Sequence, residues 1–364
     1  MQPILRASRF LLPAAFFSYA AVVNLGYAQF PGRSELPSDV ELLRGGLTAR
    51  LDTVYRKSLP HRDPAIGMIG ALRYLAVGEG RKGVLAGEDG WLFTSEEVRP
   101  LSGDLDLSLA RIARVRDRLE AAGTRLVMVP VPGKLDVMVA HSDREAAQGV
   151  ATLYDAFLAG LRSHDVPVLN ARSALRGGAE AELSFFRTDT HWTPEGAEDV
   201  AQALAASGLI DLGDSEFDIE RLSPQEFTGD LVAYVTTEDL APSIGLAPEV
   251  ASPFTATARA ADDGLDIFAG TEAGGTLLIG TSYSANPTFS FAEALKLALR
   301  RDVLNLAEEG RGPARPMLDY LASPDFRDAP PEVVIWEFPV RYLTDPALWD
   351  AQGPVKQGTV KSGA

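Results

Sequence analysis

Three hydroxyl side chains follow an apolar run in the stretch LLIGTSYSAN, residues 277–286. Buried strands of α/β proteins often end in this way, and these folds place their chemistry in loops at the carboxyl ends of strands. One of Thr281, Ser282 and Ser284 could be a nucleophile, or all three could satisfy the amides of a polar turn. Because serine is a weak nucleophile without an adjacent base, the sequence must also supply that base.

One of the four histidines lies in a setting suited to a base. His191 stands in FFRTDTHWTPEGA, two residues after Asp189. Residues two apart in an extended segment project to the same side, so Asp189 could fix the imidazole tautomer and leave the other nitrogen free. Alternatively, Asp189 caps backbone amides while His191 packs beside Trp192, and the local sequence leaves both interpretations open. His61 has a turn context, and His141 and His164 are expected at the surface.

The same residue types give little support to metal or cofactor chemistry. One histidine and one aspartate, with no second histidine at ligand spacing, leave a zinc site short of ligands, so we expect no metal. The chain has no cysteine, which excludes thiolate nucleophiles and disulfides. GEGRKG, residues 78–83, lacks the strand and helix that a phosphate loop requires. We therefore expect no cofactor.

Regular alternation of helices and short apolar strands predicts the frame that positions these residues. Strands are expected in TRLVMVPVP, VPVLN, GTLLIG, DVLNLA and EVVIWEFPV, with amphipathic helices between them. Before these, GVLAGEDGWLF reads as two strands joined by an Asp89–Gly90 turn. Thr193 and Pro194 mark the start of the helix after His191. Continuously apolar strands in βα units predict an α/β fold with a mostly parallel sheet covered by helices on both faces.

Composition shifts divide the chain into four parts. Residues 1–30 are a signal peptide or membrane anchor, because two arginines precede an uncharged run over residues 11–28. Residues 31–80 form a helical region, 81–348 the main domain and 349–364 a flexible tail. An irregular insertion with its own short strands is expected at about 210–270. We expect export to the periplasm, either free or tethered to the inner membrane, and the net charge of −16 argues against nucleic acid as a partner.

Taken together, GTSYS and the upstream TDTHWTPEGA resemble the SGNH-hydrolase-like domain of the alginate O-acetyltransferase family of AlgJ and AlgX. DGWLF, VPVPGK, DVLNLAEEGRGP and IWEFPVRYL match as well, so the resemblance covers residues 80 to 345. It implies an SGNH-like fold in which the motif order is circularly permuted, with Asp-x-His before Ser. Because the chain ends soon after IWEFPVRYL, it is more similar to AlgJ than to AlgX, which carries a further carbohydrate-binding module.

The resemblance implies a role for each of the three residues. Ser282 is expected to be the nucleophile, His191 the base and Asp189 its orienting partner. Thr281 stands where an SGNH esterase carries Asp, and Asp-x-x-His is shortened to Asp-x-His. The implied reaction passes an acetyl group through Ser282 to a hydroxyl of an exported polysaccharide, alginate or another acidic exopolysaccharide. The implied partners are a membrane-bound O-acyltransferase that supplies acetyl groups and other proteins of an acetylation complex.

Further positions are candidates for stabilising the oxyanion or binding the polymer. Oxyanion donors are expected from the Ser282 amide and from a backbone amide near Gly310 to Gly312, with Tyr283 and Asn305 as weaker candidates. The candidates for binding a uronate chain are Arg187, Trp192, Arg311 and Arg341. Core packing for Trp192 and ordinary surface charge for the arginines are the alternatives.

Two other functions fit the same residues. A carbohydrate acetylesterase would use the same acyl-enzyme and pass the acetyl group to water, and the sequence does not separate these two acceptors. A non-catalytic member of an acetylation complex would carry a vestigial triad.

Overall fold

The computed structural model describes residues 13–25, 62–101, 105–177, 183–259 and 275–350. The chain divides into two compact units, Met1–Leu72 and Arg73–Ala364. Residues 13–25 of the first unit are helical, and α4 (Arg62–Val77) crosses the boundary between the units. Within the described ranges no helix combines the length and apolar character needed to span a bilayer. Export therefore stays a prediction, and most of the predicted leader, His61 and all but the first two residues of the predicted tail lie outside the described residues.

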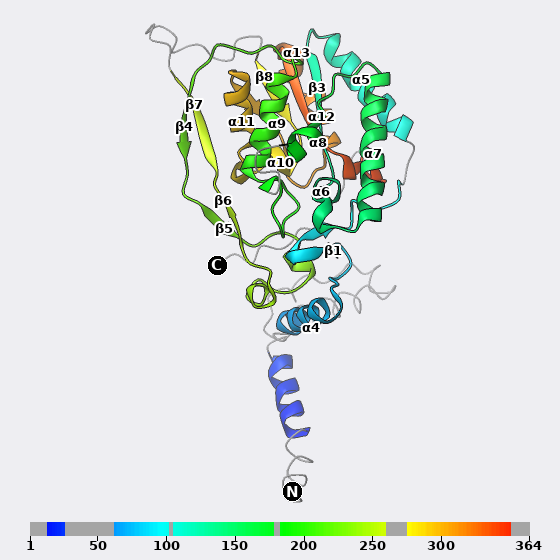
Figure 1. Cartoon of the computed structure of the whole chain (residues 1–364), viewed down its shortest axis with the longest axis vertical. Coiled ribbons are helices and arrows are strands. Elements are labelled where there is room, and N and C mark those ends of the chain that lie inside the picture. The colour runs from blue at the N-terminus through cyan, green and yellow to red at the C-terminus, as the bar shows by residue number, and fades with distance from the viewer. Residues whose placement is uncertain (1–12, 26–61, 102–104, 178–182, 260–274, 351–364) are drawn as a thin grey trace, which may run out of the picture. The chain divides into compact units, whose positions relative to one another are not determined.

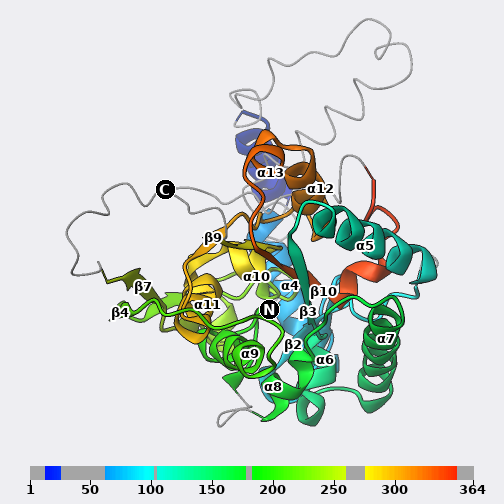
Figure 2. The same ribbon diagram turned by 90° about the horizontal axis from the view of Figure 1, so that it is seen from above.

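The second unit is built on the parallel sheet that the alternating pattern predicts. Its strand order is β3 (Arg125–Val131), β10 (Val333–Pro339), β8 (Thr276–Ile279) and β9 (Val303–Asn305), and every pair is parallel. Successive side chains of β3 and β10 point into two separate apolar cores. Helices therefore cover both faces, as Figures 1 and 2 show.

The helices divide between the two faces. One core packs against α8 (Ala171–Gly177), α9 (Pro194–Ala206) and α11 (Phe291–Leu299). The other packs against α5 (Leu105–Glu120), α7 (Arg144–Ser163), α12 (Ala314–Ala322) and α13 (Pro324–Asp328). The short helices α6 (Lys134–Val137) and α10 (Ser282–Ala285) follow β3 and β8 directly. Short 3₁₀ helices occupy Glu88–Gly90, Val139–His141, Val232–Tyr234, Ala241–Ile244, Pro287–Phe289 and Val340–Thr344.

Small antiparallel pairs surround this sheet. β1 (Val84–Ala86) pairs with β2 (Leu92–Thr94) across the predicted turn, in which Asp89 and Gly90 both have positive φ. In the insertion β4 (Phe217–Arg221) pairs with β7 (Phe254–Ala258), and β5 (Gln225–Phe227) with β6 (Glu249–Ala251). Figure 1 shows these strands along the side of the unit next to α11. Short strands therefore occur within residues 217–258, while residues 260–270 of the expected insertion lie outside the described ranges.

One predicted strand is wrong. VPVLN, residues 166–170, forms only an isolated parallel bridge between Val168 and Met128. The Met128 amide donates to the Pro167 carbonyl at 2.8 Å, and the Leu169 amide donates to the Met128 carbonyl at 3.0 Å. Because α8 begins at Ala171, the segment turns away before a ladder can form.

Candidate active site

A tight turn at the carboxyl end of β8 presents Ser282. The strand ends at Ile279, Gly280 follows, and Thr281 caps α10 by accepting a hydrogen bond from the Tyr283 amide. Ser282 is the first residue of α10 and is partly exposed, whereas Thr281 and Ser284 are buried. Of the three hydroxyls in this stretch, the one on Ser282 is therefore open to a reactant.

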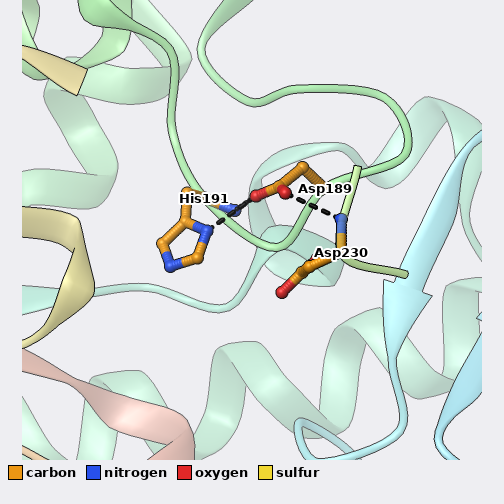
Figure 3. Close-up of side chains that lie close together, drawn as sticks. All are labelled: Asp189, His191 and Asp230. Atoms are coloured by element: carbon orange, nitrogen blue, oxygen red, sulfur yellow. Dashed lines mark hydrogen bonds and ion pairs between the residues drawn. The ribbon is translucent and has the colours of Figure 1, made fainter. Parts of the chain in front are cut away.

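His191 joins Ser282 to Asp189. Its Nε2 lies 2.7 Å from Ser282 Oγ, and its Nδ1 lies 2.6 Å from Asp189 Oδ1. Asp189 Oδ1 also accepts the His191 amide at 2.9 Å, so the carboxylate both caps the backbone and orients the ring. Asp189 therefore makes both of the contacts that the sequence left open, while the rings that pack on His191 are those of Tyr283 and Phe289 and not of Trp192. Figure 3 shows Asp189 beside the His191 imidazole.

Aromatic rings hold the imidazole in its plane. The Phe289 ring stacks on His191 with centroids 4.7 Å apart, and the Tyr283 ring lies at 4.7 Å on a tilted plane. The Tyr283 hydroxyl donates to the Thr190 carbonyl at 2.8 Å, which ties α10 to the histidine segment. Packing thus restricts the rotation that would break the contact with Ser282.

Asp189 is buried and ionised. Burial disfavours its charge. The His191 imidazole and the backbone amides of His191 and Asp230 nevertheless hold the pKa of Asp189 below its ordinary value. Behind it lies Lys134, whose Nζ donates to the Asp189 carbonyl at 2.9 Å and to the carbonyls of Leu92 and Arg187. Burial lowers the pKa of Lys134 to about 8, against the pull of nearby carboxylates that include Asp189.

Glu337 on β10 binds the turn that carries Ser282. Its carboxylate accepts the Thr281 amide at 2.7 Å, the Thr281 hydroxyl at 3.0 Å and the Ser284 hydroxyl at 3.1 Å. A Cβ on Gly280 would lie 2.4 Å from Glu337 Oε2, so glycine is required where the strand passes the carboxylate. The hydroxyls on either side of Ser282 therefore fix the turn.

Glu337 predicts a pH dependence of stability. Burial raises its pKa to about 7, despite the donors from Thr281 and Ser284 and the charge of Arg341. A raised pKa means that its stabilising contribution is complete below the unfolded-state value and is lost as pH rises through about 7. Replacing Glu337 by Gln should remove this loss, on the order of 3 kcal/mol between pH 4.5 and 8. Urea unfolding of both proteins across this range measures it, and parallel curves would contradict the assignment.

Tyr283 and Asn305, two of the side chains expected to stabilise the oxyanion, have other hydrogen-bond partners in the structure. The Tyr283 hydroxyl is buried and bonded to the Thr190 carbonyl and to Arg341 Nη1. The Asn305 amide donates to the Ser284 carbonyl at 2.7 Å, so it stabilises the loop. Among the described residues no hydrogen-bond acceptor is found for the Ser282 amide, which is one of the unpaired donors of the first turn of α10. Gly310 and Gly312, both with positive φ, lie in the turn after β9.

The structure separates the four candidates for polymer binding. Trp192 is 0% exposed and donates to the Tyr283 carbonyl, and Arg341 is 6% exposed against the Tyr283 and Tyr342 rings. Both predictions of direct polymer contact are therefore wrong, because these side chains belong to the core. Arg311 pairs with Glu308 and Asp319, while Arg187 is exposed two residues before Asp189.

Asp189, His191 and Asp230 bring ligand-type atoms within 4.8 Å of one another. Each of these groups already has a protein partner. Asp189 bonds His191 and the Asp230 amide, and the Asp230 carboxylate accepts the Thr190 amide at 2.8 Å. The arrangement fits a hydrogen-bonded relay better than a metal site.

Lys134, Glu337 and Asp230 were not identified from the sequence. A charged residue inside the otherwise apolar VVIWEFPV was a usable signal for Glu337, because a buried charge needs partners. Lys134 had a comparable signal at the end of the apolar VPVPG. Asp230 had none, since it lies in the irregular insertion.

Comparisons with known proteins show the family of this chain. Residues 84–340 match the family described as SGNH hydrolase-like domain, acetyltransferase AlgX. The chain is 36% identical over 320 residues to the probable alginate O-acetylase AlgJ of Pseudomonas aeruginosa, covering 84% of this chain and 82% of that protein. It is 28% identical over 278 residues to the alginate biosynthesis protein AlgX of Pseudomonas putida, covering 71% of this chain and 57% of that protein.

Two solved structures are similar as well. The O-acetyltransferase domain of Pseudomonas putida AlgJ has a TM-score of 0.63 and 38% identity, covering 72% of this chain and 93% of that one. Pseudomonas aeruginosa AlgX has a TM-score of 0.55 at 23% identity, covering 73% of this chain and 68% of that one, which shows a shared fold.

Proposed function

Because this chain belongs to the family of SGNH hydrolase-like domains of the acetyltransferase AlgX, we propose that it is a polysaccharide O-acetyltransferase that works through an acetyl-serine. The observation that carries the proposal is the chain of contacts from Ser282 Oγ through His191 to Asp189, at 2.7 and 2.6 Å. These contacts lie at the carboxyl end of β8, the edge of an α/β sheet at which ligands generally bind.

In the first half-reaction Ser282 takes the acetyl group. His191 Nε2 removes the hydroxyl proton as Oγ attacks the acetyl carbonyl, and Asp189 stabilises the imidazolium through Nδ1. The negative oxygen of the tetrahedral intermediate can accept from the Ser282 amide at the start of α10. His191 then returns the proton to the leaving group, and the acetyl ester on Ser282 remains.

In the second half-reaction a sugar hydroxyl takes the place of the leaving group. His191 Nε2 removes its proton as the oxygen attacks the acetyl-serine, and the same amide stabilises the second intermediate. Collapse of that intermediate breaks the bond to Oγ, and His191 reprotonates Ser282. The product is an acetylated polymer and free enzyme.

The acceptor that we propose is alginate, because the relatives aligned over most of their length carry the name alginate O-acetylase. Exposed Arg187, close to Asp189 in the chain, is the remaining candidate for contact with a uronate carboxylate.

The test incubates the protein with a soluble acetyl ester and polymannuronate, and measures acetylated polymer and free acetate. We expect acetyl groups on the polymer in excess over the acetate released by hydrolysis. Acetate alone, unchanged by added polymer, would instead identify an acetylesterase. Failure of an arylsulfonyl fluoride to label Ser282 would point to a non-catalytic role.

We propose that the reaction takes place in the periplasm and that residues 1–30 are a signal peptide or an anchor. A membrane-bound O-acyltransferase would be the source of the acetyl groups. The periplasmic location is supported by the uncharged run after Arg6 and Arg9. Fractionation of cells that express the full chain tests the location, and recovery in the cytoplasm would contradict it.

A further inference from the structure

Residues 188–191 make two sets of contacts. Asp189 contacts His191, while Thr188 and Thr190 bond acidic residues of the insertion. The Thr188 hydroxyl donates to Glu249 on β6 at 2.6 Å, and the Thr188 amide donates to the same carboxylate. The insertion therefore holds the two threonines, while Asp189 and His191 make the contacts of the relay.

Asp230 contacts this segment in two ways. Its backbone amide donates to Asp189 Oδ2 at 2.8 Å, and its carboxylate accepts the amide and hydroxyl of Thr190 at 2.8 and 2.9 Å. Gly229 makes the approach possible, because a Cβ there would lie 2.4 Å from the Thr188 backbone. Figure 3 shows Asp230 beside the carboxylate of Asp189 and near His191.

We propose that Asp230 is a second carboxylate of the Ser282–His191–Asp189 relay, a positioning residue that holds Asp189 and makes His191 a stronger base. The inference rests on the proposed function. Its geometric basis is that oxygen and nitrogen atoms of Asp189, His191 and Asp230 lie within 4.8 Å of one another. Burial and the charge of Asp189 raise the pKa of Asp230 above its ordinary value, against the pull of His191 and the Thr190 donors. Once Asp230 is ionised, its negative charge at this distance favours the imidazolium that forms when Ser282 gives up its proton.

Other charged or titratable groups surround the same relay, and the Asp230 substitutions leave all of them in place. They are Lys134 of α6, Glu97, Glu249 of β6, Tyr283 of α10 and Arg341. Glu249 offers a matched control, because it accepts the same two kinds of donor from Thr188 but lies outside the cluster around His191.

The experiment measures the rate at which an arylsulfonyl fluoride labels Ser282 between pH 5 and 9, in the full-length protein. Asp230→Asn keeps an oxygen for Thr190 and leaves the backbone amide on Asp189, but removes the charge. In a plot of the labelling rate against pH, the rise on the acid side (the acid limb) should move to lower pH by about half a unit in Asp230→Asn. The labelling rate on the plateau above this rise should fall about threefold. Asp230→Ser should show the same displacement, Asp230→Glu should restore the wild-type limb, and Glu249→Gln should leave the limb in place.

An acid limb that stays in place in both Asp230→Asn and Asp230→Ser would overturn the inference while leaving the proposed function intact. An equal displacement in Glu249→Gln would also overturn it, because the effect would then come from general loosening of the segment. A wild-type protein whose Ser282 is not labelled would overturn the proposed function and the inference together.

Discussion

Replacing Ser282 by alanine should reduce acetyl transfer to the polymer by a factor on the order of ten thousand or more. The physical reason is that no acetyl-serine can form, while His191 and Asp189 keep their contact at 2.6 Å. Because Ser282 Oγ makes one side-chain contact in the relay, with His191 Nε2, the fold should tolerate the change. Acetyl groups on the polymer and thermal unfolding measure the two expectations.

Ser284→Ala is the matched control. Ser284 is two residues away on the same short helix, and its hydroxyl donates to Glu337 at 3.1 Å. Losing this hydrogen bond from a hydroxyl to a buried carboxyl group should cost about 1 to 3 kcal/mol of stability and leave the acetyl-serine pathway open. If Ser284→Ala abolished transfer and Ser282→Ala did not, the nucleophile would be wrongly assigned.

Short-range features of the sequence pointed to the parts of the relay, and the resemblance to the family implied their roles. Asp189 and His191 are two residues apart, and Ser282 stands at the end of a recognisable strand. Parallel strands place their carboxyl ends at one edge of the sheet, so a histidine segment in another loop can reach that serine. Contacts of 2.7 Å and 2.6 Å then complete the arrangement.

The supporting residues depend on long-range features that periodicity does not contain. Glu337 reaches Thr281 because β10 pairs with β8 in a register that puts Trp336 opposite Ile279. Asp230 reaches Asp189 over a sequence separation of 41 residues, which includes α9, β4 and β5. Neither the register of a parallel pair nor the path of an insertion follows from apolar spacing.

The wrong binding predictions have a different cause. Trp192 and Arg341 are residue types that serve equally well in a sugar site and in a core. Arg341 lies next to the buried end of β10 and stacks on Tyr283, which keeps its guanidinium out of water. Only the position of each side chain relative to the sheet separates the two uses.

Replacing Asp189 by asparagine should lower kcat by a factor on the order of one thousand to ten thousand, with KM little changed. The carboxylate accepts on both oxygens, from His191 at Oδ1 and from the Asp230 amide at Oδ2. An amide group cannot accept on both sides. With its oxygen toward His191, its NH₂ meets the Asp230 N–H; with its NH₂ toward His191, it selects the tautomer whose Nε2 carries the proton and cannot take one from Ser282.

The control for this prediction is Asp143→Asn, the same change at the N-cap of α7, where the side chain accepts from Ala146 and asparagine can do likewise. Its kcat should match that of the wild type. Steady-state transfer to the polymer, with thermal unfolding of both variants, measures the difference. If Asp189→Asn kept near-normal kcat, Asp189 would serve only as the cap of the His191 amide, and the imidazole would have to be oriented by the rings of Phe289 and Tyr283 alone.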